Sequence, residues 1–187
     1  QVVAMISMPK HARPNNSSDI AFYAKQHDIF YHELENINSL KALDLLRKYE
    51  PDYIFVSWPK MIKTDVINTP KYFCIGTHPS NLPYNRGRHP LHWIIALGIQ
   101  ETKLSFFKMD EGVDTGDLLL QVPFTIATDN TINDVNDKMN HAAYEGTKKL
   151  CQKFQSHTSY QGEKQNHELA NYWRKRTPHD ITLDLRM

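Results

Sequence analysis

The sequence has little cysteine and no long apolar run, and each shortage excludes a class of protein. Its 187 residues include only Cys74, inside an apolar run, and Cys151, near the end of a helical pattern. This usage does not fit a disulfide framework and indicates a reducing, intracellular setting. The longest apolar runs, such as DYIFVSW and HWIIALG, are too short to span a bilayer, and no secretory signal opens the chain. We therefore expect a cytoplasmic protein without a membrane partner.

The sequence also has almost no excess of positive over negative charge. Lysine and arginine number 22, aspartate and glutamate number 21, and the formal net charge is +1. This balance excludes a bulk attraction to nucleic acid or to an anionic membrane, so any anionic partner must be held locally. The basic run WRKR, Trp173 to Arg176, is too short for a nucleic-acid face and is interpreted as solvated surface.

Motifs that bind metals or nucleotide phosphates are absent from the sequence. There is no His/Cys cluster with zinc spacing, no EF-hand spacing, and neither GxGxxG nor GxxxxGK[ST]. We therefore expect no metal ion. The acidic loop DEGVDTGD, residues 110–117, keeps three interpretations: a cation loop, a solvated turn, or a carboxylate that orients a base. Its residues alone slightly favour the plain turn.

Short apolar runs alternate with helical patterns along the chain. Strands are expected at Gln1–Ser7 and Ile29–Tyr31 and in PDYIFVSW, KYFCIGT, KLSFFKM and DLLLQVPFTI. Helices are expected at Asp19–Gln26, at Ser39–Tyr49 with Leu40, Leu43 and Leu46 as its apolar stripe, at Met61–Val66, in PLHWIIALG up to Gly98, and from a Thr131 cap to Phe154. This alternation is typical of an α/β fold whose parallel strands are joined by crossover helices.

The segment CIGTHPSNLPYNRGRHPLHW, residues 74–93, is a crowded polar loop after a predicted strand. A strand that ends at His78 puts its imidazole at the carboxyl edge of the sheet, where open α/β folds bind ligands. His78 is therefore a candidate for moving a proton or for donating to an oxyanion, although histidines bonded into turns are more frequent. Arg86 and Arg88 are candidate clamps for a carboxylate or phosphate, and equally candidates for plain surface charges.

Together, these motifs resemble the formyltetrahydrofolate-dependent formyltransferase family. HPSNLPYNRG is similar to the family's His-x-Ser-Leu-Leu-Pro-x-x-Arg-Gly loop, and KMDEGVDTGDLLLQ to its Met-Asp-x-Gly-x-Asp-Thr-Gly segment, with the family separation between His78 and Asp114. YWRKRTPHD resembles a C-terminal family signature. The resemblance implies an open, mostly parallel Rossmann-like sheet with helices on both faces. It also implies a catalytic domain at 1–155 that lacks its first strand and helix, and a C-terminal extension at 156–187 with a short helix and strand.

The resemblance further implies an N-formyltransferase that uses 10-formyltetrahydrofolate, with His78 and Asp114 as catalytic residues. His78 would donate a hydrogen bond to the oxyanion and help to move the proton, while Asp114 would orient His78 and favour its protonated form. The positions that match the family's folate site are Lys60, Met61, Ile62, Arg88, Asp110, Glu111, Gly112 and Val113. Gly76 departs from the pattern, because the family usually has an asparagine there as a second oxyanion donor. Either a backbone N–H, Thr77 or Asn81 replaces that donor, or the protein is slow or inactive.

The acceptor is also inferred from the resemblance. RGRHPLHW is closer to nucleotide-sugar N-formyltransferases, which favour Arg-Gly-Arg, than to methionyl-tRNA enzymes, where small residues follow Arg-Gly. The chain also ends before the separate tRNA-binding domain of the latter. We therefore expect a nucleotide-linked amino sugar of polysaccharide biosynthesis as acceptor, no nucleic-acid partner, and a homodimer paired through strands near Ile181 to Leu185. The alternatives are a glycinamide ribonucleotide-type formyltransferase and a non-catalytic folate- or nucleotide-sugar-binding module.

Overall fold

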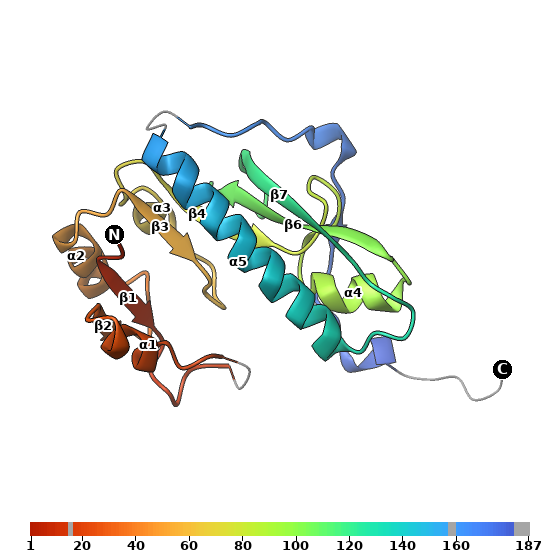
Figure 1. Cartoon of the computed structure of the whole chain (residues 1–187), viewed down its shortest axis with the longest axis horizontal. Coiled ribbons are helices and arrows are strands. Elements are labelled where there is room, and N and C mark those ends of the chain that lie inside the picture. Colours follow the sequence, from red (N-terminus) through yellow and green to blue (C-terminus); the bar gives the residue numbers. More distant parts are fainter. Residues whose placement is uncertain (15–16, 157–159, 182–187) are drawn as a thin grey trace. The chain divides into compact units, whose positions relative to one another are not determined.

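The computed structural model describes residues 1–14, 17–156 and 160–181, and the chain divides into two compact units, residues 1–74 and 75–187 (Figure 1). Strands and helices alternate along the chain, as the apolar pattern predicts. Within the described residues, no helix is long and apolar enough to cross a membrane.

The first unit begins with a parallel strand pair. Strand β1 (Ala4–Ser7) pairs with β2 (Phe30–Glu33), and α1 (Ile20–Gln26) connects them. Two parallel strands need such a crossover, because a tight turn can join only antiparallel neighbours. The helix and β2 agree with the sequence prediction to within about two residues, and β1 begins three residues later than the predicted start at Gln1.

Helix α2 (Leu40–Lys48) shows where the predicted apolar stripe is wrong. The hydroxyl of Ser39 accepts a 3.2 Å hydrogen bond from the Ala42 N–H, which confirms the cap at the predicted start. Leu43 and Leu46 are buried, but Leu40 is 79% exposed. Residues three positions apart are offset by about 60° around a helix, so Leu40, Leu43 and Leu46 do not all lie on the buried face. Ala42 is buried there in place of Leu40.

The rest of the first unit completes one apolar core. Strand β3 (Tyr53–Val56) is followed by α3 (Thr64–Ile67), which begins later than the predicted helix at Met61. The buried cluster consists of Leu34, Ile37, Ala42, Leu43, Leu46 and Val66, and Trp58 and Ile62 pack against it.

The second unit is built on antiparallel strands. Strand β4 (Phe73–His78), which starts at the end of the first unit, pairs antiparallel with β6 (Glu101–Lys108), and β6 pairs antiparallel with β7 (Leu118–Thr125). The short loop at residues 109–117 joins β6 directly to β7, and a direct connection without a crossover helix makes neighbouring strands antiparallel. His78 is the last residue of β4 and lies opposite Ser105.

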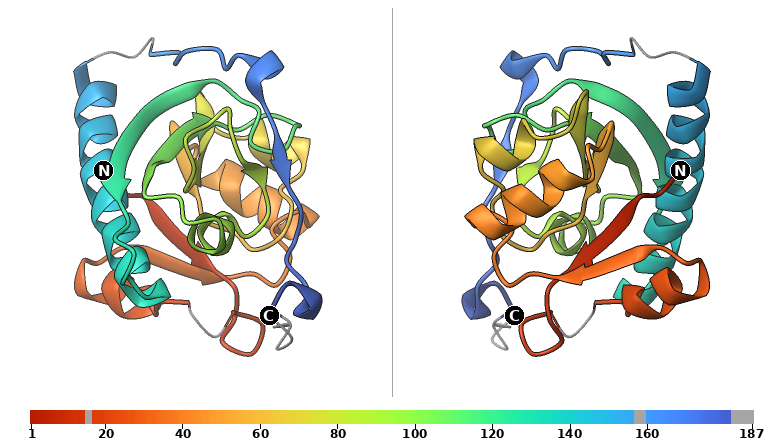
Figure 2. Two further views of the ribbon diagram at one scale, coloured as in Figure 1. Left: turned by 90° about the vertical axis from the view of Figure 1, so that its right-hand side faces the viewer. Right: turned by 90° about the vertical axis from the view of Figure 1, so that its left-hand side faces the viewer.

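The long helix α5 (Ile132–Ser156) covers β7 and β6 (Figures 1 and 2). The Thr131 N–H donates to Asp134 Oδ2 at 2.7 Å, and the Asp134 N–H donates to Thr131 Oγ at 3.4 Å, so the predicted cap at Thr131 is confirmed. A Cβ atom at Gly146 would lie 2.2 Å from the Phe106 ring, so glycine is required for this close approach of helix and sheet.

The remaining elements bring two distant segments together (Figure 2). Strand β5 (Arg86–Gly87) and helix α4 (Pro90–Ala96) follow the loop after His78, whereas η1 (His167–Leu169), β8 (Tyr172–Trp173) and η2 (Pro178–Ile181) follow α5. Strands β5 and β8 pair in parallel, Arg86 with Tyr172 and Gly87 with Trp173. A strand is expected from Ile181 to Leu185. Its residues beyond Ile181 lie outside the part of the chain that the structure describes.

Candidate active site

His78 lies between two acceptors. Its side chain is buried, and Nε2 is 2.8 Å from the carbonyl oxygen of Asn85. Because a carbonyl oxygen can only accept, the network assigns a hydrogen to Nε2. The other ring nitrogen, Nδ1, is 3.4 Å from Asp114 Oδ2. The structure therefore brings together the two residues predicted to be catalytic, and it adds Asn85 as a third member of the group.

The two partners of His78 have unusual backbones. Asn85 has a φ of 62° and Asp114 a φ of 57°, both in the left-handed region that glycine favours and that Asn and Asp tolerate better than other residues. The Gly87 N–H donates a 2.9 Å hydrogen bond to Asp114 Oδ2. Such backbone conformations persist where the surrounding structure holds them, and they cluster at functional sites.

The loop between β6 and β7 forms a turn and also presents a carboxylate to His78. Asp110 Oδ1 accepts hydrogen bonds from the Gly112 N–H at 3.0 Å and from Thr115 Oγ at 2.6 Å. A Cβ at Gly116 would lie 1.7 Å from the Lys108 carbonyl oxygen, so only glycine lets the chain return this closely. Asp110 thus forms the turn, and Asp114 faces the histidine. Among the described residues, no group of three His, Cys, Asp or Glu side chains is placed to hold a metal ion.

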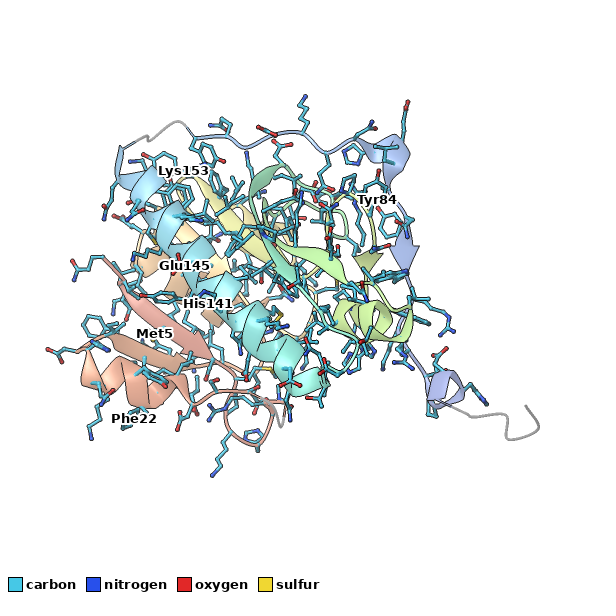
Figure 3. The ribbon with its side chains drawn as sticks, turned by 45° about the vertical axis from the view of Figure 1, so that its right-hand side comes forward. Met5, Phe22, Tyr84, His141, Glu145 and Lys153 are labelled. Atoms are coloured by element: carbon cyan, nitrogen blue, oxygen red, sulfur yellow. The ribbon has the colours of Figure 1, made fainter. Side chains whose placement is uncertain are left out.

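Polar side chains from the sheet hold the loop that follows His78. Ser105 Oγ donates to the Ser80 carbonyl at 2.6 Å, and Gln121 Nε2 donates to the Leu82 carbonyl at 3.0 Å. Ser105 and Gln121 face each other on β6 and β7. Ser80 Oγ in turn donates to the carbonyl oxygen of Tyr84, which is labelled in Figure 3. Our sequence analysis missed these supports, although a polar residue inside an apolar strand is a signal for them.

Both interpretations of Arg86 are wrong, because its side chain is only 1% exposed and cannot clamp a ligand or serve as a surface charge. Its guanidinium donates to Gln165 Oε1 at 2.7 Å and to the Tyr172 hydroxyl at 3.1 Å, and it lies 3.2 Å from His167 Nδ1. All three partners come from the C-terminal segment, which covers Arg86. Arg88, by contrast, is exposed, and its backbone N–H donates to the Trp173 carbonyl.

A positively charged cluster surrounds the start of α4. Burial is the main cause that lowers the pKa of His89, and the nearby charges of His92, Arg88, Lys175 and Arg176 lower it further. Part of the run WRKR contributes to this cluster. Arg174 and Arg176 lie 5.2 and 5.4 Å from the Trp93 ring, and Arg174 also pairs with Asp180 at 2.5 Å. Arg174 and Lys175 of the run are exposed, as expected of solvated surface, and Arg174 and Arg176 also pack on the Trp93 ring.

The remaining predicted folate positions lie in both compact units. Asp110, Glu111, Gly112 and Val113 are exposed, and the apolar residue Val113 is 41% exposed. Lys60, Met61 and Ile62 belong to the first unit. Met61 is 65% exposed, while Ile62 packs on the core of that unit. The roles of these residues remain predictions.

Gly76 has a neighbour that explains why a side chain would be difficult to place there. It lies opposite Phe107 in the sheet, and a Cβ at Gly76 would lie 2.7 Å from Phe107 Cζ and 3.2 Å from Met109 Cγ. An asparagine therefore requires the Phe107 ring to move. Of the replacement donors considered, Thr77 is exposed and Asn81 is half-buried.

The chain belongs to the formyl transferase family, whose model matches residues 1–150. The methionyl-tRNA formyltransferase of Desulforamulus reducens is 30% identical over 179 residues, which cover 92% of this chain and 56% of that protein. The chain spans about half the length of the curated relatives it matches.

Two solved structures show the same fold. Methionyl-tRNA formyltransferase from Clostridium thermocellum superposes with a TM-score of 0.65 at 22% identity, over 89% of this chain and 72% of that one. The formyltransferase PseJ from Anoxybacillus kamchatkensis, in complex with UDP-4,6-dideoxy-4-formamido-L-AltNAc and tetrahydrofolate, superposes with a TM-score of 0.65 at 17% identity, over 83% and 79%. The predicted family and its α/β fold class are confirmed.

Proposed function

We propose that the protein is an N-formyltransferase that transfers the formyl group of 10-formyltetrahydrofolate to an amine. The observation that carries this proposal is the buried imidazole of His78, with Nδ1 3.4 Å from Asp114 Oδ2, in a chain of the formyl transferase family. A positioned histidine with an adjacent carboxylate suits acyl transfer, in which one proton must move and one oxygen becomes an anion.

In the proposed reaction the acceptor amine attacks the formyl carbon. The new C–N bond forms while the carbonyl oxygen becomes an oxyanion; the bond to N10 of the folate then breaks, and a proton passes from the amine to N10. Asn85 holds Nε2 of His78, so Nδ1 is the nitrogen that would exchange this proton and donate to the oxyanion. Asp114 would keep the ring aligned. A preorganised donor of this kind lowers a barrier by about 3 kcal/mol.

The loop at Asp110–Val113 fits the folate that the family resemblance implies. Its exposed carboxylates and backbone border the exposed apolar side chain of Val113. A pteridine has the matching character, with apolar faces and a polar edge. We assign this loop, Arg88, and Lys60 to Ile62 of the first unit to folate binding; bound folate supplies the formyl group.

As acceptor we propose the amine of a nucleotide-linked amino sugar. The Arg-Gly-Arg sequence at residues 86–88 supports this choice, because it resembles nucleotide-sugar N-formyltransferases. The positive cluster that includes Arg88, Lys175 and Arg176 supports an acceptor that carries phosphates. The role in polysaccharide biosynthesis rests on the same resemblance, the homodimer on the strands expected near Ile181 to Leu185, and the cytoplasmic setting on the cysteine usage and the short apolar runs.

Methionyl-tRNA is a second candidate acceptor, favoured by the names of the curated relatives. It also carries phosphates, so the positive cluster suits both acceptors. Methionyl-tRNA as acceptor conflicts with the expectation of no nucleic-acid partner. The acceptor must therefore be tested directly.

The test mixes the full chain with 10-formyltetrahydrofolate and separate acceptors: nucleotide-linked 4-amino and 3-amino sugars, glycinamide ribonucleotide, and methionyl-tRNA. Mass spectrometry follows the formylated product, with His78→Asn as the control. A formylated sugar that is missing with His78→Asn supports the proposal. Product from methionyl-tRNA alone would overturn the sugar acceptor, and folate binding without any product would favour a binding module.

A further inference from the structure

Gln165 connects the two loops that carry the partners of His78. Its side chain is buried, although it lies in a polar stretch of sequence. Gln165 Nε2 donates to the carbonyl oxygens of Asp114 at 2.9 Å and Gly116 at 2.7 Å, while Oε1 accepts from Arg86 at 2.7 Å. Arginine can only donate, so Arg86 fixes which end of the Gln165 amide faces the loop of Asp114. One amide therefore joins the β6–β7 loop to the loop after His78.

Asn171 makes a second connection, on the other side of the imidazole. Its Oδ1 accepts from the Asn85 N–H at 2.9 Å, and its Nδ2 donates to Asn85 Oδ1 at 3.0 Å. The backbone carbonyl of Asn171 accepts from the Arg86 N–H at 3.0 Å. Asn85 is the residue whose carbonyl holds His78 Nε2. A single asparagine thus fixes both the backbone and the side chain of that residue.

The start of the same segment is tied to the sheet as well. Lys153 of α5, labelled in Figure 3, donates to the Tyr160 hydroxyl at 3.3 Å, and that hydroxyl donates to the Leu119 carbonyl oxygen. The Glu163 N–H then donates to the Leu118 carbonyl at 2.8 Å. The segment therefore reaches Gln165 already anchored along β7, so that Gln165 meets the two loops from a fixed position.

We propose that residues 165–173, which we call the C-terminal clamp, position the imidazole of His78 from both sides. Gln165 holds the loop of Asp114, and Asn171 holds Asn85. Both held residues have left-handed backbones, which need such outside support. Gln165 and Asn171 are positioning residues, because their hydrogen bonds go to Asp114, Gly116 and Asn85 and not to the imidazole itself. The effect on turnover rests on the proposed formyl transfer, whereas the effect on the imidazole does not.

The test uses the neutral variants Gln165→Met and Asn171→Ala in the full chain. Asn166→Ala is the matched control, because Asn166 lies in the same segment and its side chain caps η1 by accepting from the Glu168 N–H, while its backbone carbonyl accepts from the Leu169 N–H. A pH titration by NMR follows the imidazole signals of His78, which are assigned by their loss in His78→Asn. We expect both clamp variants to move the His78 chemical shifts and titration curve, and the control to leave them in place.

Steady-state kinetics gives a second readout. We expect roughly tenfold to hundredfold lower kcat in both clamp variants, because small misplacements of a reacting group have effects of this size. The KM for 10-formyltetrahydrofolate should stay within about twofold, whereas a general loss of structure would change both constants.

Each outcome decides one point. Unchanged His78 signals in a folded Asn171→Ala variant, or equal changes in Asn166→Ala, would overturn the clamp. If Gln165→Met does not fold, the exposed Asn171 still carries the test. A wild-type protein that forms no product from any acceptor would contradict the proposed function, while the NMR titration would still decide on the clamp.

Discussion

The Gly87 N–H donates to Asp114 Oδ2 at 2.9 Å, so the loop after His78 and the loop between β6 and β7 meet at one carboxylate. The same oxygen faces His78 Nδ1 at 3.4 Å. The Asp114 carboxylate therefore has a structural partner in the backbone of Gly87 and a chemical one in the imidazole.

These two contacts can be separated by Asp114→Asn. An asparagine oxygen still accepts from the Gly87 N–H, so the fold should survive, but the negative charge that faces His78 is lost. We expect kcat to fall roughly a hundredfold to ten-thousandfold, the range typical of lost acid–base assistance. Formylation assays measure this, with Asp117→Asn as the control three residues along the same loop. Equal activities of the two variants would contradict the proposed role of Asp114.

Gly76→Asn should destabilise the protein by about 1–3 kcal/mol, the usual range for overpacking a buried site. The added Cβ would lie 2.7 Å from Phe107 Cζ, and that ring must move. Thermal unfolding measures the loss. Combining Gly76→Asn with Phe107→Leu should recover part of it. If the asparagine restores an oxyanion donor, the double variant will also turn over faster than Phe107→Leu alone. A single variant as stable as the wild type would contradict this account.

His89 should make the protein sensitive to acid. Its pKa in the folded state lies below its ordinary value, mainly because of burial and also because of the positive charges around it. Between that lowered value and about pH 6.5, the unfolded chain binds more protons than the folded one, so stability rises with pH in this window and falls on acidification. Urea unfolding at several pH values in this window measures the free energy of unfolding, which should rise less steeply with pH in His89→Gln than in the wild type. An equally steep rise in both proteins would contradict the prediction.

The two cysteines should differ in reactivity. Burial raises the pKa of the Cys74 thiol to about 12, and no part of its side chain is exposed, whereas Cys151 is exposed. Because the thiolate is the reactive form, a disulfide reagent should modify one thiol per folded chain and the second only after unfolding. The substitution Cys151→Ser should abolish this rapid modification of the folded chain. Fast modification that persists in Cys151→Ser would overturn the assignment.

Local interactions made part of this fold predictable from the sequence. The Ser39 and Thr131 caps each act within three residues, and Gly98 ends α4 with a φ of 65°. His78 and Asp114 were identified because both lie in recognisable motifs. Gln165, however, contacts a residue 51 positions away, and Asn171 contacts one 86 positions away. No periodicity or motif encodes such pairs, and the burial of Arg86 became visible only when the C-terminal segment was in place.

The parallel pairing of β5 with β8 also bears on where the protein can be shortened. The family resemblance implies a C-terminal extension of the catalytic domain at residues 156–187, and the described residues 160–181 belong to the same compact unit as His78. A truncation after α5 would remove Gln165, His167 and Tyr172, which contact the Arg86 guanidinium, and it would release Asn85 at the same time. Crystallisation fragments, fusion partners and affinity tags should therefore leave residues 160–181 intact, because the compact unit that holds His78 extends beyond α5.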